Sequence, residues 1–207
     1  LRIPGLIVSI SGLGFLYTEK NNKTKLVRQI VNWAYFYILG HKNLRVIVQN
    51  SDDLKIIKNL RNISDEQTIM IKGVGVDLQK YSPSEANLRT NQVVLVARIL
   101  KDKGVEEFIA ASTILRKRGY KNKYILVGSL DEENPSGLSK NYLFKLIENS
   151  PIEYWGERSD VPFILSNSKI FVLPSYREGF PKVIMEAKAC GCAVVTTNAP
   201  GCREAVV

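Results

Sequence analysis

Residues 170–196 read IFVLPSYREGFPKVIMEAKACGCAVVT, and this stretch decides the fold. The apolar run Ile170 to Leu173 predicts a buried strand, and Pro181 opens a helix that continues to Cys190. A second strand, Ala193 to Thr196, follows that helix. In open α/β sheets the ligand lies beyond the carboxyl ends of the strands, so residues 174–180 are expected at a binding cleft.

The alternation of strand and helix continues outward from this unit along the whole chain. Apolar and β-branched runs predict strands at residues 6–10, 44–48, 68–71, 92–97, 124–127 and 152–154. Apolar residues at helical spacing predict helices at 25–39, 52–60, 103–118, 138–148 and 161–166, and Ser51 is expected to cap the second of these. We therefore expect an α/β fold with open parallel sheets wound on both faces.

One polar, proline-bearing stretch divides the chain. Residues 82–87, Ser-Pro-Ser-Glu-Ala-Asn, have the composition of an interdomain linker. We place the boundary near Pro83, which gives one domain at residues 1–82 and a second at 83–207. The chain starts at Leu1 without a targeting segment, so we expect its true N-terminus to lie upstream.

The charge balance favours an anionic partner. The chain has 29 Lys and Arg against 20 Asp and Glu, a net charge of +9. A nucleotide, a phospholipid surface, a lipid pyrophosphate and a nucleic acid all fit this charge. The longest apolar runs, such as Trp33 to Leu39, are far shorter than the ~20 residues that span a bilayer.

Cysteine usage favours a reducing, cytoplasmic compartment. Cys190, Cys192 and Cys202 are an odd number and lack the paired spacing of a zinc site. His41 is the only histidine, so a metal at the Cys-x-Cys pair is disfavoured. Because His41 follows Gly40 at a helix end, we expect it to be a capping or surface residue.

Two cations follow the strand at residues 92–97. Arg98 and Lys103 lie close to a helix start, where backbone N–H groups also favour an anion, so they form a candidate diphosphate clamp. Two solvated surface cations would give the same pattern. Spacing alone does not separate these interpretations.

Two carboxylates follow the strand at residues 170–173. Glu178 lies at the mouth of that strand, and Glu186 lies in the second turn of the next helix, so both can face one cleft. One carboxylate could hold a sugar hydroxyl and the other a ribose. Alternatively, an isolated pair of acids near a helix start could serve only to interact favourably with the helix dipole, which stabilises a helix by about 0.3–1 kcal/mol for each acid.

The longer string around these acids resembles a family signature. Residues 174–191 are similar to the Glu-Gly-Phe/Leu-Pro-x-x-x-x-Glu-Ala-x-Ala-x-Gly signature of the family 4 glycosyltransferases, and Pro-Gly-Cys-Arg-Glu at 200–204 looks like members that build lipid-linked glycans. Residues 73–77, 96–98 with 101–104, and 11–15 resemble further segments of the same family. The resemblance covers nearly the whole chain, and its specificity is concentrated in residues 174–206.

The resemblance implies a GT-B fold, in which two Rossmann-like domains face a cleft, both incomplete in this chain. It implies a retaining transfer of a hexosyl or N-acetylhexosaminyl group from a nucleotide sugar, with a UDP-sugar favoured. The acceptor would be a glycan or a polyprenyl-diphosphate-linked glycan in cell-surface polysaccharide assembly. No metal or cofactor is then required. The protein would be cytoplasmic and in peripheral contact with the anionic inner membrane face.

The resemblance also assigns residues to roles. Arg98, Lys103 and Glu178 would be the catalytic set, with the two cations neutralising the donor diphosphate and Glu178 contacting the donor sugar. The backbone of the next residues would cradle sugar and phosphate, and Glu186 would hold the ribose hydroxyls. The full donor-binding set is Arg98, Lys103, Glu178, Gly179, Phe180, Lys182 and Glu186, and the acceptor side contributes Gly12 and Gly14.

Two other functions fit parts of the sequence. A GT-B-like epimerase or phosphorylase would share the fold, but the string from Glu178 to Glu186 disfavours it. A basic module that binds nucleic acid or acidic membrane would share the charge, but the cations are scattered over both halves, no nucleic-acid motif is present, and we expect no nucleic-acid partner.

An aromatic cluster marks the helix at residues 25–39. Trp33, Tyr35, Phe36 and Tyr37 would meet a lipid-linked acceptor or the inner leaflet if the nearby basic residues Lys20, Lys23, Lys25 and Arg28 meet anionic headgroups. A helix packed against its own sheet explains the same residues, and we favour that interpretation.

Overall fold

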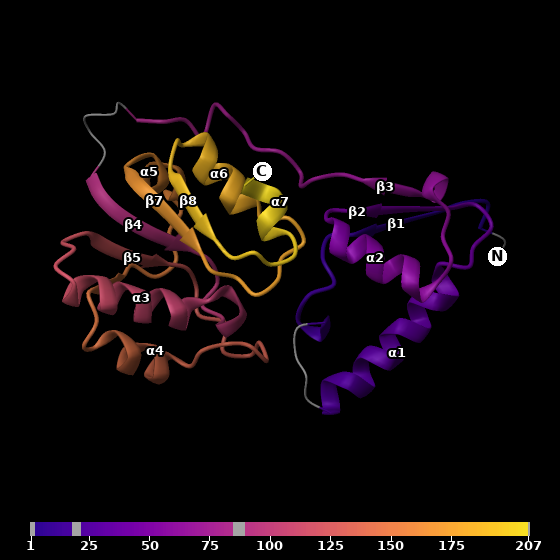
Figure 1. Ribbon diagram of the computed structural model, residues 1–207, viewed down its shortest axis with the longest axis horizontal. Helices are drawn as coiled ribbons and strands as arrows, with labels where there is room; N and C mark the ends of the chain where they lie inside the picture. Colours follow the sequence, from indigo (N-terminus) through magenta and orange to yellow (C-terminus); the bar gives the residue numbers. More distant parts are fainter. Residues whose placement is uncertain (1–2, 18–21, 85–89, 207) are drawn as a thin grey trace.

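The computed structural model describes residues 3–17, 22–84 and 90–206 and contains two separate parallel sheets (Figure 1). The smaller sheet has the order β1-β2-β3, formed by Leu6–Ile10, Leu44–Val48 and Thr68–Met70. The larger sheet has the order β6-β5-β4-β7-β8. The predicted linker at residues 82–87 lies partly outside the described residues, and the boundary near Pro83 stays a prediction.

The smaller sheet is built around a short apolar core. Its helices are α1, Asn22–Ile38, and α2, Ser51–Leu60, with 3-10 turns η1, Phe15–Tyr17, and η2, Asp65–Gln67. Leu44, Val46 and Val48 alternate along β2 and pack with Ile57 of α2, because successive side chains of a strand point to opposite faces. On the other face Ile7 of β1 is exposed.

The larger sheet has two strands on each side of its central strand, β4. It contains β4, Thr90–Val96; β5, Lys123–Val127; β6, Ile152–Tyr154; β7, Ser168–Leu173; and β8, Ala193–Thr196, all paired in parallel. The chain runs from β4 outward to β6 and then returns to β7 on the other side of β4. The strand order therefore reverses between β4 and β7, which is where open α/β sheets bind ligands.

Helices cover both faces of the larger sheet (Figure 1). Val93 and Leu95 pack with α3, Val105–Lys117, and α4, Lys140–Ile147. Val94 faces the opposite way and belongs to the core under α5, Val161–Ser166, α6, Lys182–Ala189, and α7, Cys202–Val206. The predicted doubly wound arrangement is present in this sheet.

Two predicted helix starts were wrong in detail. Asn50, not Ser51, is the N-cap of α2, because its side chain accepts the Asp53 N–H while Ser51 is already helical. Lys103 lies in a separate 3-10 turn, η4, Lys101–Lys103, rather than in α3. Gly104 ends that turn with φ 74°, a left-handed conformation that glycine adopts at little cost, so α3 begins at Val105.

The preferred interpretation of the aromatic cluster was also wrong. Trp33 and Tyr37 are 66% and 70% exposed, and their rings contact each other at 5.0 Å between centroids. Tyr35 packs against the small core, and Leu39, just after the helix, is buried. Most of the apolar face of α1 is therefore not covered by its own sheet. Among the described residues, α1 and the other helices are all too short or too polar to cross a membrane.

Candidate functional site

The candidate site lies at the carboxyl ends of β4 and β7, which are neighbours in the larger sheet. Arg98 follows β4, Lys103 ends η4, and Glu178 lies in the loop after β7. These three residues line two adjoining hollows at once. The structure therefore brings the two candidate cations and the first candidate carboxylate together at one cleft.

The first hollow separates the two sheets and has a volume of about 250 Å³. Gly12 and Gly14 line it from the loop after β1, and Arg177, Glu178 and Gly179 line it from the loop after β7. The two predicted acceptor-side glycines thus face the predicted catalytic set across this hollow.

The second hollow lies within the larger-sheet half and has a volume of about 350 Å³. Lys182 and Glu186 of α6 line it, together with Tyr81 from the segment that connects the two sheets. Glu186 is buried and pairs with Lys182, four residues earlier, at 3.2 Å. Arg98, Lys103 and Glu178 therefore stand between one hollow that faces the smaller sheet and another that reaches Glu186.

The ion pairs of the site differ in their exposure to water. Lys103 Nζ lies 2.6 Å from Glu178 Oε1, and the two side chains are only 19% and 14% exposed. Arg98 pairs with Asp131 at 2.8 Å and is 57% exposed. The Lys103–Glu178 pair is thus better shielded from solvent than the Arg98–Asp131 pair.

Tyr81 is a neighbour of Glu186 that the sequence did not single out. Burial raises the pKa of Tyr81 to about 12. The negative charge of Glu186 and a hydrogen bond to its carboxylate contribute to the same rise. The Tyr81 phenol is therefore neutral at physiological pH and available as a donor to the Glu186 carboxylate. A tyrosine in a connecting segment looks like a packing residue, so only the folded arrangement links it to the site.

Residues 79–207 match the model of the protein family described as Glycosyl transferases group 1. The chain belongs to this family. It is 36% identical over 218 residues to the N,N'-diacetylbacillosaminyl-diphospho-undecaprenol alpha-1,3-N-acetylgalactosaminyltransferase of Campylobacter jejuni, a match that covers 99% of this chain and 55% of that protein. It is 33% identical over 210 residues to the capsular polysaccharide biosynthesis glycosyltransferase CapM of Staphylococcus aureus, covering 93% and 54%. The chain spans about half the length of these relatives.

Solved structures of glycosyltransferases share the fold. Anabaena HepE in complex with UDP and glucose superposes with a TM-score of 0.75 at 19% identity, covering 97% of this chain and 55% of that one. WaaG, a glycosyltransferase involved in lipopolysaccharide biosynthesis, gives a TM-score of 0.73 at 17% identity, covering 99% and 60%. The predicted GT-B fold and the predicted glycosyltransferase family are both confirmed.

Two signature residues make packing contacts, and of these Gly179 lines the first hollow while Phe180 lines neither hollow. A Cβ on Gly179 would lie 1.5 Å from the Ser11 carbonyl oxygen, so the missing side chain lets the loop approach the backbone of the other half. Phe180 packs against the core of the larger sheet, and its ring lies against Gly73.

The other singled-out residues lie away from the cleft or inside the core. His41 is in the loop between α1 and β2, where its Nε2 is 3.0 Å from the Ile3 carbonyl oxygen and its Nδ1 accepts the Asn43 N–H. Cys190, Cys192 and Cys202 are buried. Within residues 3–17, 22–84 and 90–206, no cluster of three or more His, Cys, Asp or Glu is arranged to hold a metal ion.

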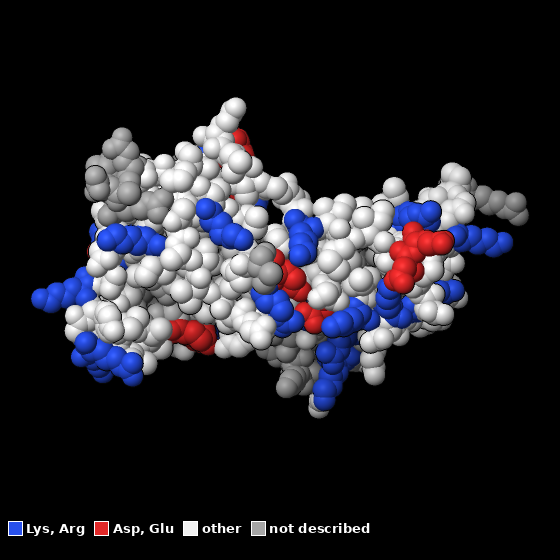
Figure 2. All heavy atoms as spheres, turned by 45° about the horizontal axis from the view of Figure 1, so that its top comes forward, with Lys and Arg blue, Asp and Glu red and all other residues white. Residues whose placement is uncertain are grey.

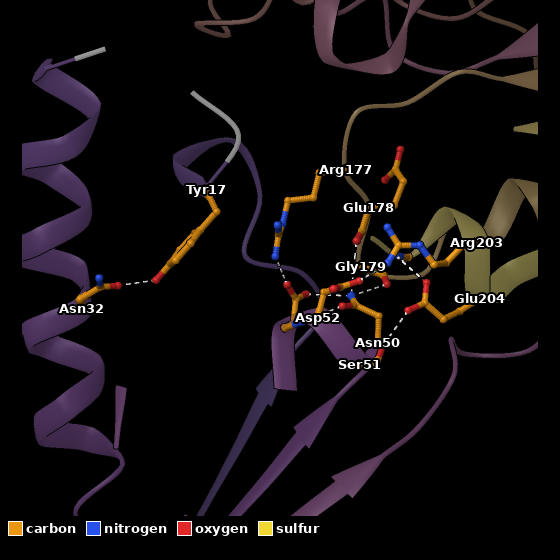
Figure 3. A network of polar contacts seen from close by, with 12 residues as sticks. Tyr17, Asn32, Asn50, Ser51, Asp52, Arg177, Glu178, Gly179, Arg203 and Glu204 are labelled. Atoms are coloured by element: carbon orange, nitrogen blue, oxygen red, sulfur yellow. Dashed lines mark hydrogen bonds and ion pairs between the residues drawn. The ribbon is translucent and has the colours of Figure 1, made fainter. Parts of the chain in front are cut away.

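The sequence missed the contacts between α2 and the signature loop. Arg177 forms an ion pair with Asp53. Asn50 Nδ2 donates to the Gly179 carbonyl at 2.8 Å (Figure 3). Arg177 lies inside the signature, next to Glu178, and this position was the one sequence signal that pointed to it. Its partner is more than a hundred residues away and looks like an ordinary helix start.

Proposed function

We propose that this protein is a glycosyltransferase that moves a sugar from a nucleotide-sugar donor, preferably a UDP-sugar, to a lipid-linked glycan acceptor during cell-surface glycan assembly. The observation that carries the proposal is the convergence of Arg98, Lys103, Glu178 and Glu186 on one cleft of a group 1 glycosyltransferase. We also propose that residues 1–82 belong to the acceptor-side domain and residues 83–207 to the domain that binds the donor.

In this proposal the second hollow takes the donor. Arg98 and Lys103 meet the diphosphate, and Glu186 meets the ribose hydroxyls from its position on α6. Glu178 and the backbone of Gly179, Phe180 and Lys182 meet the sugar and phosphate. Negative charge grows on the diphosphate as the glycosidic bond breaks, and fixed cations in a partly dry cleft stabilise that charge. The acceptor attacks from the face that the nucleotide leaves, so the anomeric configuration is retained.

The acceptor side is proposed from the first hollow and from the relatives. Gly12 and Gly14 border that hollow opposite Glu178. The names of the Campylobacter jejuni relative and of an Escherichia coli galactosyltransferase, 26% identical over 212 residues, both specify a diphospho-undecaprenol-linked acceptor. A polyprenyl diphosphate carries a sugar and an anionic group at a membrane surface. We therefore propose a cytoplasmic protein in peripheral contact with the anionic inner membrane face.

The donor assignment has a direct test in the full-length protein. We expect Lys103→Ala and Glu186→Ala each to lower kcat/KM for transfer by more than about 100-fold, because each removes a charged contact to the donor. The matched controls Lys101→Ala, in the same 3-10 turn, and Glu148→Ala, at the exposed end of α4, should retain near wild-type turnover.

A thermal-shift screen with UDP-, GDP- and ADP-sugars identifies the donor, since a ligand that binds only the folded state raises the Tm. Unchanged turnover in a folded Lys103→Ala or Glu186→Ala variant would contradict the site. A Tm that responds to none of the nucleotide sugars would contradict the function.

A further inference from the structure

Four consecutive residues at the start of α2 contact the loop after β7 or helix α7 of the larger-sheet half. Asn50 Nδ2 donates to the Gly179 carbonyl at 2.8 Å, and Ser51 Oγ donates to Glu204 Oε1 at 3.1 Å. Asp52 Oδ2 accepts from Arg203 at 2.8 Å, and Asp53 pairs with Arg177. Figure 3 shows Asn50, Ser51 and Asp52 of α2 and its cap lying opposite Gly179, Arg203 and Glu204 between the two halves of the molecule. We call residues 50–53 the α2 clamp.

The inner contacts of the α2 clamp are buried. Asn50 and Asp53 are fully buried, and the side chain of Arg177 is 10% exposed. A buried ion pair adds little net stability, because the loss of hydration offsets most of the attraction between the charges. The two charges must nevertheless stay in contact, since a single unpaired charge buried in that place would strongly destabilise the fold. The Asp53–Arg177 pair is therefore better suited to fixing the position of Arg177 than to stabilising the fold.

Hydrogen bonds fix the orientation of the Asn50 amide. Its Oδ1 accepts the Asp53 N–H at 2.8 Å, which caps α2, and its Nδ2 donates to Asp53 Oδ2 at 2.9 Å and to the Gly179 carbonyl. The oxygen side of the amide is thus committed to the helix, and the nitrogen side faces the loop. A serine at this position would cap the helix equally well but would not reach Gly179.

These contacts hold the residues immediately before and after Glu178 in the chain. Arg177 and Gly179 are each held by the α2 clamp, and the Glu178 N–H donates to the Pro200 carbonyl at 3.0 Å. The backbone of Glu178 consequently has little freedom, and its carboxylate reaches Lys103 at 2.6 Å. The smaller-sheet half thereby sets where the Glu178 carboxylate stands between the two hollows.

We propose that Asn50 and Asp53 are positioning residues for sugar transfer, which hold the loop of residues 177–179 so that Glu178 meets the reacting sugar. This inference rests on the proposed function. A misplacement of about 1 Å can cost about 100-fold in rate, so small movements of this loop matter. The proposed diphosphate contacts, Arg98 and Lys103, follow β4, and Lys103 is linked to the clamped loop through its ion pair with Glu178.

The test separates positioning from stability by measuring three quantities on the full-length protein. These are kcat for transfer from the UDP-sugar, the Kd for UDP alone, and the Tm. We expect Asn50→Ser to lower kcat by about tenfold to 100-fold while the Kd for UDP changes less than about twofold. The exposed Asp65, near the far end of α2, provides the control, and Asp65→Asn should change neither quantity.

A second set of variants keeps the test decisive if Asn50→Ser fails to fold. Asp53→Asn alone leaves a buried, unpaired Arg177 and should lower both kcat and Tm. Adding Arg177→Gln removes the second charge and should recover most of the Tm while kcat stays low, so the effects on Tm are far from additive.

Wild-type kcat in the folded double variant, or a Kd for UDP that rises as much as kcat falls, would overturn the positioning role. A wild-type protein that neither binds UDP nor transfers a sugar would overturn the proposed function together with this inference. A wild-type enzyme that is active beside equally active variants would overturn the inference alone.

Discussion

Single glycines decide how closely the signature loop packs. A Cβ on Gly201 would lie 2.4 Å from the Glu178 carbonyl oxygen and 2.5 Å from that of Gly179. Gly75 has the same φ of 78°, yet a Cβ there would meet no atom within 4 Å. Replacing either glycine by alanine imposes the same backbone strain. Only the alanine at position 201 would also push its methyl group against the loop beside Glu178.

This pair of glycines gives a prediction with a built-in control. We expect Gly75→Ala to lower the free energy of unfolding by about 1–2 kcal/mol through its left-handed φ alone. Gly201→Ala should lose about 1–3 kcal/mol more, because the new methyl group overlaps two carbonyls. UDP-sugar turnover should fall in Gly201→Ala and stay near wild type in Gly75→Ala. Urea unfolding and steady-state kinetics measure both effects, and equal losses in the two variants would show that the packing is irrelevant.

At the residue scale, the candidate residues that the sequence indicated follow a strand, as Arg98 and Glu178 do, or lie on the helix after one, as Glu186 does. Arg98, Glu178 and Glu186 could be placed in one cleft because parallel strands bring their carboxyl ends to the same edge. Asn50 and Asp53 could not be placed, since their importance depends on Arg177, which is far away in the chain. Ser51 was expected to be the cap of α2 because Asn, Ser and Asp all cap helices well, and only the backbone conformation selects Asn50.

At the element scale, α1 differs most from its prediction. Leu26, Ile30, Trp33 and Tyr37 follow helical spacing and are all exposed. Periodicity in a sequence predicts that a helix has an apolar face, but it does not say what covers that face. The helix carries the exposed Lys25 beside its apolar stripe. Apolar side chains flanked by cations are the combination that binds an anionic membrane surface.

The element-scale prediction follows from this exposed stripe of α1. We expect Trp33→Glu to lower binding of the full-length protein to vesicles containing anionic phospholipid by at least about tenfold, because it removes the largest apolar contact and adds a like charge. Phe163→Glu is the matched control, since Phe163 of α5 is 67% exposed on a different element. Vesicle co-sedimentation measures both variants. Equal binding by the wild type and Trp33→Glu would argue that another part of the protein covers α1.

At the scale of the whole molecule, the excess positive charge lies mostly outside the cleft. Figure 2 shows Lys and Arg distributed from one end of the visible face to the other. Within the site, by contrast, Lys103 and Arg177 are each paired with a carboxylate, Glu178 and Asp53. The net charge of +9 therefore describes the surface as a whole. Composition predicted an anionic partner but could not locate it, because charge counts contain no positions.

This distribution predicts two different responses to salt. A single-stranded oligonucleotide attracted by scattered cations should lose about 100-fold in affinity when KCl rises about tenfold, if it contacts about three phosphates. The UDP-sugar should lose less than about tenfold, since its contacts in the cleft are partly shielded and include uncharged groups. Titrations of both ligands over the same KCl range, with unlabelled UDP as competitor, measure the two slopes. Equal slopes, or an oligonucleotide that displaces the UDP-sugar completely, would instead favour a basic binding module over a glycosyltransferase cleft.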